Sequence, residues 1–271
     1  MNYTYDENGV RYNQVKVVHD DAKNWVFLPG GPGADSRYLL SLVDAIDIKG
    51  NIWLVDLPGA GDNDANDAYD FNNWFTLLPS IVSRFTNCIL VAHSFGGVLP
   101  LLSPPLEKLL LGLVIINSAP TLWLTESEIV ARQRNVPVLP EREVFMKNPT
   151  DENYKKLRDK YIPYYFNKNK VEEGFELFKN VPFQVKTMLK VFNLLKERGY
   201  NAEWIPQKVK AMIIGGDSDF INPFKLFEQD KRFNRNNIRL TRLENCGHWC
   251  WVDGPDEVKG LFDDFAGRLD K

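Results

Sequence analysis

The sequence predicts an α/β fold with a mostly parallel central sheet and an inserted helical segment. Short, continuously apolar runs end in Gly, Pro or Asp, which is typical of parallel strands that are covered on both faces. Amphipathic helical patterns separate most of these runs, as in chains that alternate strand and helix. One long stretch, residues 119–200, contains helical patterns and no convincing strand. Together these observations predict a sheet with helices on both faces and a helical insertion.

Six runs are the candidate strands. Five are continuously apolar, and the sixth alternates apolar with polar residues, which predicts a position near an edge of the sheet. The five are residues 25–28, 52–57, 88–92, 113–117 and 211–215, and the sixth is 238–243.

Helical patterns fill the intervals. Residues 72–85 carry apolar side chains at helical spacing, although Pro79 could kink or shorten a helix there. A final helix begins at Pro255, where proline and the acidic residues that follow it suit a first turn. Its apolar stripe predicts that it packs on the sheet; the stripe is Val258, Leu261, Phe262, Phe265 and Leu269.

The insertion is predicted to be a helical cap. Its clearest helix places Val185, Leu189 and Leu195 on one face and stops at Gly199, a common helix end. Strand-like sequence resumes at Ala211, which favours an insertion over two separate domains. We therefore expect a core of residues 1–118 and 201–271, and a cap of residues 119–200 over the mouth of the site.

Composition excludes several classes of protein. The 33 basic and 36 acidic residues give a net charge of -3, without the basic excess of a general nucleic-acid binder. No apolar run approaches the roughly 20 residues that a membrane helix needs. The polar N-terminus does not resemble a secretory signal, and three cysteines do not suggest a disulfide framework. We expect a cytoplasmic protein that binds neither nucleic acid nor membrane; its oligomeric state stays open.

A candidate nucleophile, Ser94, follows the third predicted strand in the run VAHSFGG. In a nucleophile elbow, the serine occupies a strained strand-to-helix turn, so the residues two before and two after it must be small. Here they are Ala92 and Gly96, where the usual pattern has glycine at both positions. Such a turn directs the backbone N–H of Phe95 toward the substrate as one oxyanion donor.

A glycine-rich run, LPGGPG at residues 28–33, follows the first predicted strand. Its glycines allow the backbone to approach a ligand closely. A second oxyanion donor is expected from a loop after an early strand, and the N–H of Gly31 suits that position. The sequence leaves open whether the peptide bond before Pro32 is cis.

The base is chosen by elimination, because the chain has three histidines. His93 adjoins Ser94, where neighbouring side chains diverge, and His19 lies in the polar N-terminal segment. His248, between the last strand and the last helix, is the remaining candidate. Its neighbours Cys246 and Cys250 do not have the spacing of a zinc site, so no metal is expected.

The acid comes from the run GGDSDFINP, residues 215–223, which offers Asp217 and Asp219. Position alone does not separate the two carboxylates, because both follow the same predicted strand. The chain order is then Ser, Asp, His, and all three follow the carboxyl ends of strands, where open α/β sheets place their sites.

These motifs resemble those of the α/β-hydrolase superfamily over nearly the whole chain. LPGGPG resembles the HGGPG motif of proline iminopeptidases, with Pro29 in place of His, and AHSFGG resembles the elbow of esterases and carbon–carbon bond hydrolases. GDSDFINP resembles the family's acid loop, G-x-x-D-x-x-x-P, which selects Asp219, and CGHW resembles the motif of the catalytic histidine. The resemblance implies an α/β-hydrolase fold with a Ser94–His248–Asp219 triad.

The expected activity is hydrolysis of a small-molecule carboxylic ester through an acyl-enzyme, with no cofactor. Two alternatives remain: release of an N-terminal proline from an amide substrate, and ligand reception without catalysis. Proline iminopeptidases typically have D-Q-R-G where this chain has D-L-P-G at residues 56–59, and Trp where it has Phe95. An aminopeptidase also needs an anionic anchor, for which the cap offers Glu126, Glu128, Glu172, Glu173 and Glu176.

Overall fold

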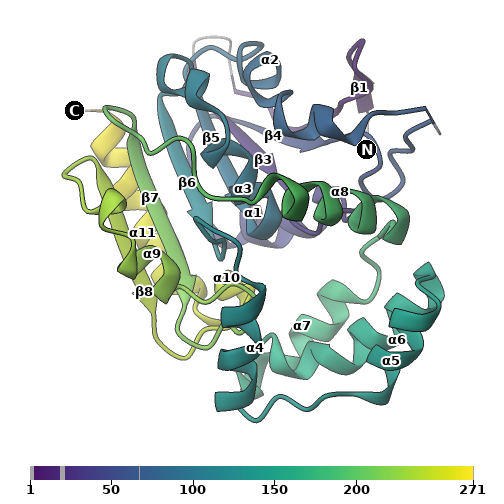
Figure 1. Ribbon diagram of the computed structural model, residues 1–271. Helices are drawn as coiled ribbons and strands as arrows, with labels where there is room; N and C mark the ends of the chain where they lie inside the picture. The colour runs from purple at the N-terminus through teal and green to yellow at the C-terminus, as the bar shows by residue number, and fades with distance from the viewer. Residues whose placement is uncertain (1–2, 19–21, 67, 271) are drawn as a thin grey trace.

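A computed structural model describes residues 3–18, 22–66 and 68–270. They form an eight-stranded sheet with helices on both faces (Figure 1). The strand order is β1-β2-β4-β3-β5-β6-β7-β8, and all pairs from β4 to β8 are parallel, whereas β1 and β2 pair antiparallel. The predicted α/β class with a mostly parallel sheet is confirmed.

Each of the six predicted strands lies within one residue of an observed one, and β8 is at an edge, as its alternation predicted. The observed bounds are β3 (Asn24–Leu28), β4 (Asn51–Asp56), β5 (Cys88–His93), β6 (Gly112–Ile116), β7 (Lys210–Gly216) and β8 (Ile238–Leu243). The sequence did not predict β1 (Tyr3–Tyr5) and β2 (Arg11–Lys16), because their polar residues carry no apolar run.

Two apolar layers cover the sheet. One face packs against α1 (Leu40–Ala45), α10 (Cys250–Asp253) and α11 (Pro255–Leu269). The other packs against α2 (Leu78–Val82), α3 (Val98–Leu101), α8 (Val185–Arg198) and α9 (Lys225–Gln229). The single helix predicted over residues 72–85 is wrong: a 3₁₀ helix at Phe71–Phe75 precedes a short α2, because Pro79 suits the first turn of a new helix.

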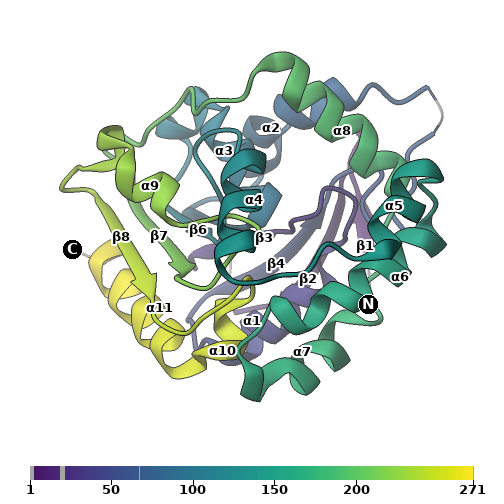
Figure 2. The same cartoon turned by 60° about the horizontal axis from the view of Figure 1, so that its bottom comes forward.

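Five α-helices lie between β6 and β7, and we call residues 124–198 the inserted helices. They are α4 (Leu124–Gln133), α5 (Pro140–Lys147), α6 (Asp151–Tyr161), α7 (Val171–Phe178) and α8. Figure 1 shows α4 to α7 grouped below the sheet, and Figure 2 brings them in front of it. Among the described residues, no helix is both long and apolar enough to cross a membrane.

Candidate active site

Ser94 occupies a strained turn at the end of β5. Its φ is 54°, in the left-handed region that residues with a side chain seldom adopt. The chain continues directly into a 3₁₀ helix, Ser94–Gly97, and then α3. Small neighbours are needed here, because a Cβ on Gly96 would lie 2.4 Å from the carbonyl oxygen of Pro29, and one on Gly30 would lie 2.6 Å from the Cβ of Ser94. The turn therefore lifts the serine side chain clear of the strand.

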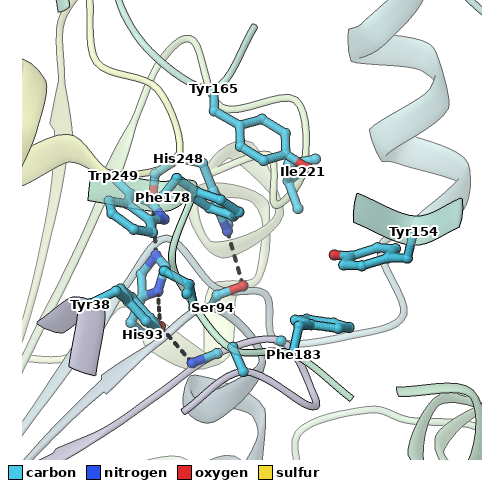
Figure 3. Close-up of a pocket in the computed structure, with 14 residues that line it drawn as sticks. Tyr38, His93, Ser94, Tyr154, Tyr165, Phe178, Phe183, Ile221, His248 and Trp249 are labelled. Carbon is cyan, nitrogen blue, oxygen red and sulfur yellow. Dashed lines mark hydrogen bonds between the residues drawn. The ribbon is translucent and has the colours of Figure 1, made fainter. Parts of the chain in front are cut away.

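A hydrogen-bonded chain joins Ser94, His248 and Asp219. His248 Nε2 lies 3.0 Å from Ser94 Oγ (Figure 3), and His248 Nδ1 lies 2.8 Å from Asp219 Oδ2. All three residues are buried, with exposed fractions of 7%, 7% and 2% respectively. Because a carboxylate only accepts, Nδ1 carries the proton and Nε2 is free to accept from the serine hydroxyl. This arrangement can withdraw a proton from Ser94 as the oxygen attacks.

The loop after β7 holds Asp219 by hydrogen bonds. Its Oδ1 accepts the backbone N–H groups of Ile221, at 2.8 Å, and Asn222, at 3.1 Å. Its Oδ2 accepts Asn117 Nδ2 at 2.9 Å, in addition to the bond with His248. Several donors to one buried carboxylate fix its orientation toward His248.

The structure separates the two candidate acids. The side chain of Asp217 is exposed to solvent, whereas that of Asp219 is buried beneath His248. Hydrogen bonding to the histidine therefore involves Asp219, the residue that the family resemblance selected.

Asparagines at the site were not predicted. Asn117 follows β6 with a φ of 46°, and its Nδ2 also donates to the carbonyl of Gly247, at 3.1 Å. It thereby links the acid loop to the loop of His248. Asn222 places its Oδ1 3.5 Å from Ser94 Oγ, a long contact. A sequence signal did exist for Asn117, since an asparagine directly after a buried strand is well suited to a left-handed backbone.

The glycine-rich loop lies beside Ser94. Gly30 and Gly31 both line the cavity next to the serine, and Gly31 has a φ of +121°, which suits glycine alone. The N–H of Gly30 donates to the hydroxyl oxygen of Tyr38 at 2.7 Å. This N–H is therefore not free to bind an oxyanion. The peptide bond between Gly31 and Pro32, which the sequence left open, is cis.

The cavity at Ser94 has a volume of about 110 Å³. Core residues line it together with side chains from the inserted helices and their connections; the latter are Tyr154, Tyr165, Phe178, Val181 and Phe183. Figure 3 shows Tyr154, Tyr165, Phe178 and Phe183 around Ser94. Apart from the two histidines, the described residues that line it carry no ionisable acid or base other than tyrosine. The cavity is therefore aromatic and essentially neutral.

The residues that the sequence analysis considered and rejected do not belong to the Ser94–His248–Asp219 chain. His19 lies outside the described residues. His93 is buried near His248, with ring centroids 4.9 Å apart, but its nitrogens bond to the Tyr38 hydroxyl and to the backbone carbonyl of His248, and not to the His248 ring. Cys246 and Cys250 are buried free thiols, and within the described residues no three His, Cys, Asp or Glu side chains gather as metal ligands would.

A parallel sheet that carries a serine on a sharp turn after its central strand, with histidine and aspartate on later loops, defines the α/β-hydrolase class. The sequence agrees: the model of the alpha/beta hydrolase family matches residues 25–260, and the chain belongs to this family. The family that the motifs indicated is thus confirmed. No curated protein sequence matches the chain significantly.

Solved structures of low sequence identity share the fold. An esterase from Thermogutta terrifontis has a TM-score of 0.68 at 12% identity, covering 97% of this chain and 94% of its own. An esterase from Exiguobacterium antarcticum has a TM-score of 0.66 at 17% identity, covering 97% and 96%. An epoxide hydrolase from Bacillus megaterium has a TM-score of 0.66 at 16% identity, covering 98% and 100%. These similarities establish the fold of the chain, and the substrate has to be inferred from the residues of the site.

Proposed function

We propose that the protein hydrolyses small, uncharged carboxylic esters through an acyl-enzyme on Ser94. One observation carries the proposal: Ser94 Oγ lies 3.0 Å from His248 Nε2 at the base of a neutral, aromatic cavity. A serine bonded to a base that is itself oriented by a carboxylate is the arrangement that activates a hydroxyl for attack on a carbonyl.

In the proposed mechanism, Ser94 Oγ attacks the ester carbonyl while His248 Nε2 takes its proton. Asp219 stabilises the imidazolium that forms. The backbone N–H groups of Gly31 and Phe95 hold the oxyanion, each worth about 10²–10³ in rate. His248 then donates the proton to the departing alcohol. Water, activated by the same histidine, releases the acid and regenerates Ser94.

We also propose that residues 119–200 act as a cap on a core formed by residues 1–118 and 201–271. In support, residues from 154 to 183 line the cavity opposite Ser94. A cover of this kind excludes water and selects substrates. The cavity is smaller than the roughly 300–1,000 Å³ of sites for drug-sized ligands, which favours a short acyl group.

The neutral cavity favours an ester over an N-terminal amine as the substrate. A protonated amine needs an anionic partner, and none of the five glutamates considered for that role is among the residues that line the cavity. Four of them pair with cations elsewhere: Glu126 with Lys225, Glu128 with Arg132 and Arg142, Glu173 with Lys170, and Glu176 with Lys179.

A substrate panel tests the proposal. Purified protein is assayed with 4-nitrophenyl esters of increasing acyl length, with an ester that carries a charged acyl group, and with prolyl and alanyl amides. We expect multiple turnovers on the short neutral esters and at least about 10²-fold lower kcat/KM on the amides and the charged ester, because the cavity offers no counter-charge. Protein inactivated with a fluorophosphonate is the matched control. A single slow turnover would indicate a receptor, and faster cleavage of prolyl amides would contradict the ester assignment.

A further inference from the structure

His93 uses both of its ring nitrogens, although it is not part of the Ser94–His248–Asp219 chain. It is 2% exposed. Its Nδ1 lies 2.7 Å from the hydroxyl of Tyr38, and its Nε2 lies 3.0 Å from the backbone carbonyl of His248 (Figure 3). The side chain therefore diverges from that of Ser94, as the sequence suggested, but it diverges into the loop that carries the catalytic histidine.

The partners determine the direction of each bond. A carbonyl oxygen only accepts, so His93 Nε2 carries a proton and donates to His248. Burial, reinforced by the proximity of His248, lowers the pKa of His93 well below its usual range, so the ring is neutral and Nδ1 accepts. The Tyr38 hydroxyl then donates to Nδ1 while its oxygen accepts the N–H of Gly30. One directional chain thus runs from Gly30 through Tyr38 and His93 to His248.

This chain crosses three segments that are distant in sequence. Tyr38 lies 55 residues before His93, and His248 lies 155 residues after it. Buried aromatic rings pack against the network: Tyr38 stacks on Trp249 with centroids 4.8 Å apart, and His93 meets Trp251 edge-on at 4.9 Å. The network is therefore buried, fully paired and continuous from the glycine loop to the histidine loop.

We propose that His93 is a positioning residue that sets the distance between His248 and Ser94 and, through Tyr38, the position of the glycine loop. The residue after Gly30 is the proposed oxyanion donor Gly31, so the network aligns base and oxyanion site with the nucleophile. The proposal rests on the proposed function in that Ser94 and His248 carry out the reaction. His93 itself touches no reacting atom.

Three variants test the two hydrogen bonds of His93 separately: the bond to the backbone of His248 and the bond to Tyr38. His93→Asn keeps an acceptor near the position of Nδ1 and loses the donor to His248. His93→Gln extends an amide N–H toward the position of Nε2. Tyr38→Phe removes only the hydroxyl. We expect kcat on a short ester to fall about 10²-fold in His93→Asn and Tyr38→Phe with little change in KM, because small displacements of reacting groups cost that much. His93→Gln should recover about tenfold of this loss.

A structural control accompanies them. Val258→Ala removes buried methyl groups from α11 on the sheet face, away from the cavity, and should lower Tm without lowering kcat. If Val258→Ala has the same Tm as the His93 and Tyr38 variants and loses as much kcat as they do, the proposal is overturned, because lost stability would then explain the effect. Unchanged kcat in both His93→Asn and Tyr38→Phe would also overturn it.

Nitrogen-15 NMR of protein labelled at histidine tests the network without any substrate. The chain has three histidines, so single variants assign the signals. We expect His93 to hold the Nε2-protonated tautomer at neutral pH, and Tyr38→Phe to shift the His248 signals. A proton on His93 Nδ1, or His248 signals unaffected by Tyr38→Phe, would overturn the inference. If the esters are not hydrolysed while the tautomer is as expected, the proposed function fails and the positioning network stands.

Discussion

The strand ends of the sheet and the inserted helices face each other across Ser94, but they are built differently. On the sheet side, Ser94, His248 and Asp219 are buried and joined to one another by hydrogen bonds. On the other side, the cavity-lining residues of the insertion are only half-buried; they are Tyr154, Tyr165, Phe178, Val181 and Phe183. The contrast teaches that buried backbone and polar contacts fix the groups proposed to react, whereas the side chains proposed to select the substrate belong to a less buried layer.

Hydrogen bonds join the insertion to the loop that carries His248. The backbone N–H of His248 donates to the carbonyl of Tyr165 at 2.8 Å. Asp253 accepts the N–H of Gly247 at 2.7 Å and that of Asn167 at 2.8 Å. A displacement of this part of the insertion would therefore act directly on His248.

The largest effect is expected on the sheet side. Ser94→Ala should lower kcat on a short ester by about 10⁵–10⁶-fold, because a triad acts as a unit and removing its nucleophile removes the covalent route. Tm should stay within a few degrees of the wild-type value. A fluorophosphonate should label the wild type at Ser94, as measured by mass spectrometry of peptides, and should not label the variant. Labelling that persists in Ser94→Ala would refute the assignment of the nucleophile.

Much of the sheet side could be predicted because its signals are local. Buried parallel strands are continuous apolar runs, and Ser94 lies in a motif whose small residues the turn requires. With three histidines in the chain, elimination was enough to select His248. The strand β2 could not be found in this way, because it buries Arg11, whose charge is balanced by Asp56 at 2.9 Å from 45 residues away.

The network around His93 could not be predicted either, because it too depends on contacts between residues that are far apart in the sequence. Its hydrogen bonds join His93 to Tyr38 and to the backbone of His248, and neither contact is visible in the residues that surround His93 in the sequence. The cavity wall is a second example: the sequence offered many aromatic residues in the insertion, and only the fold determines which of them face Ser94.

The second prediction compares the two aspartates after β7. Asp219→Asn should lower kcat by about 10⁴-fold with the fold intact, because the amide supports the wrong histidine tautomer. Asp217→Asn is the matched control: its side chain is exposed, and we expect less than about a threefold change. Turnover and Tm of both variants decide the assignment. Should the inactive but well-folded variant be Asp217→Asn, the acid is misassigned.

The third prediction concerns the insertion. Phe183 lines the cavity and stacks on Tyr154 with ring centroids 4.2 Å apart. Phe183→Ala should enlarge the cavity and raise the kcat/KM ratio of a long to a short acyl ester about 10- to 200-fold, the range for apolar pocket contacts. Met146→Ala, on the exposed surface of α5, is the control and should leave this ratio unchanged. An unchanged ratio in Phe183→Ala would mean that acyl length is selected elsewhere.

The last prediction concerns stability against pH, where the two regions should differ again. Burial lowers the pKa of His93 well below its usual value, so the native protein holds this ring neutral. The unfolded chain takes up a proton there below about pH 6.5, so stability falls as the pH falls, by up to about 1.4 kcal/mol per pH unit. Since His93→Gln cannot titrate, its unfolding free energy should fall less steeply between about pH 6.5 and 5. In the insertion, the hydrogen bond to Lys156 lowers the pKa of the exposed Glu152, so Glu152→Gln should keep the wild-type slope in this range. Urea unfolding across the pH series measures both slopes, and parallel curves for wild type and His93→Gln would show that the native state protonates His93 as readily as the unfolded chain does.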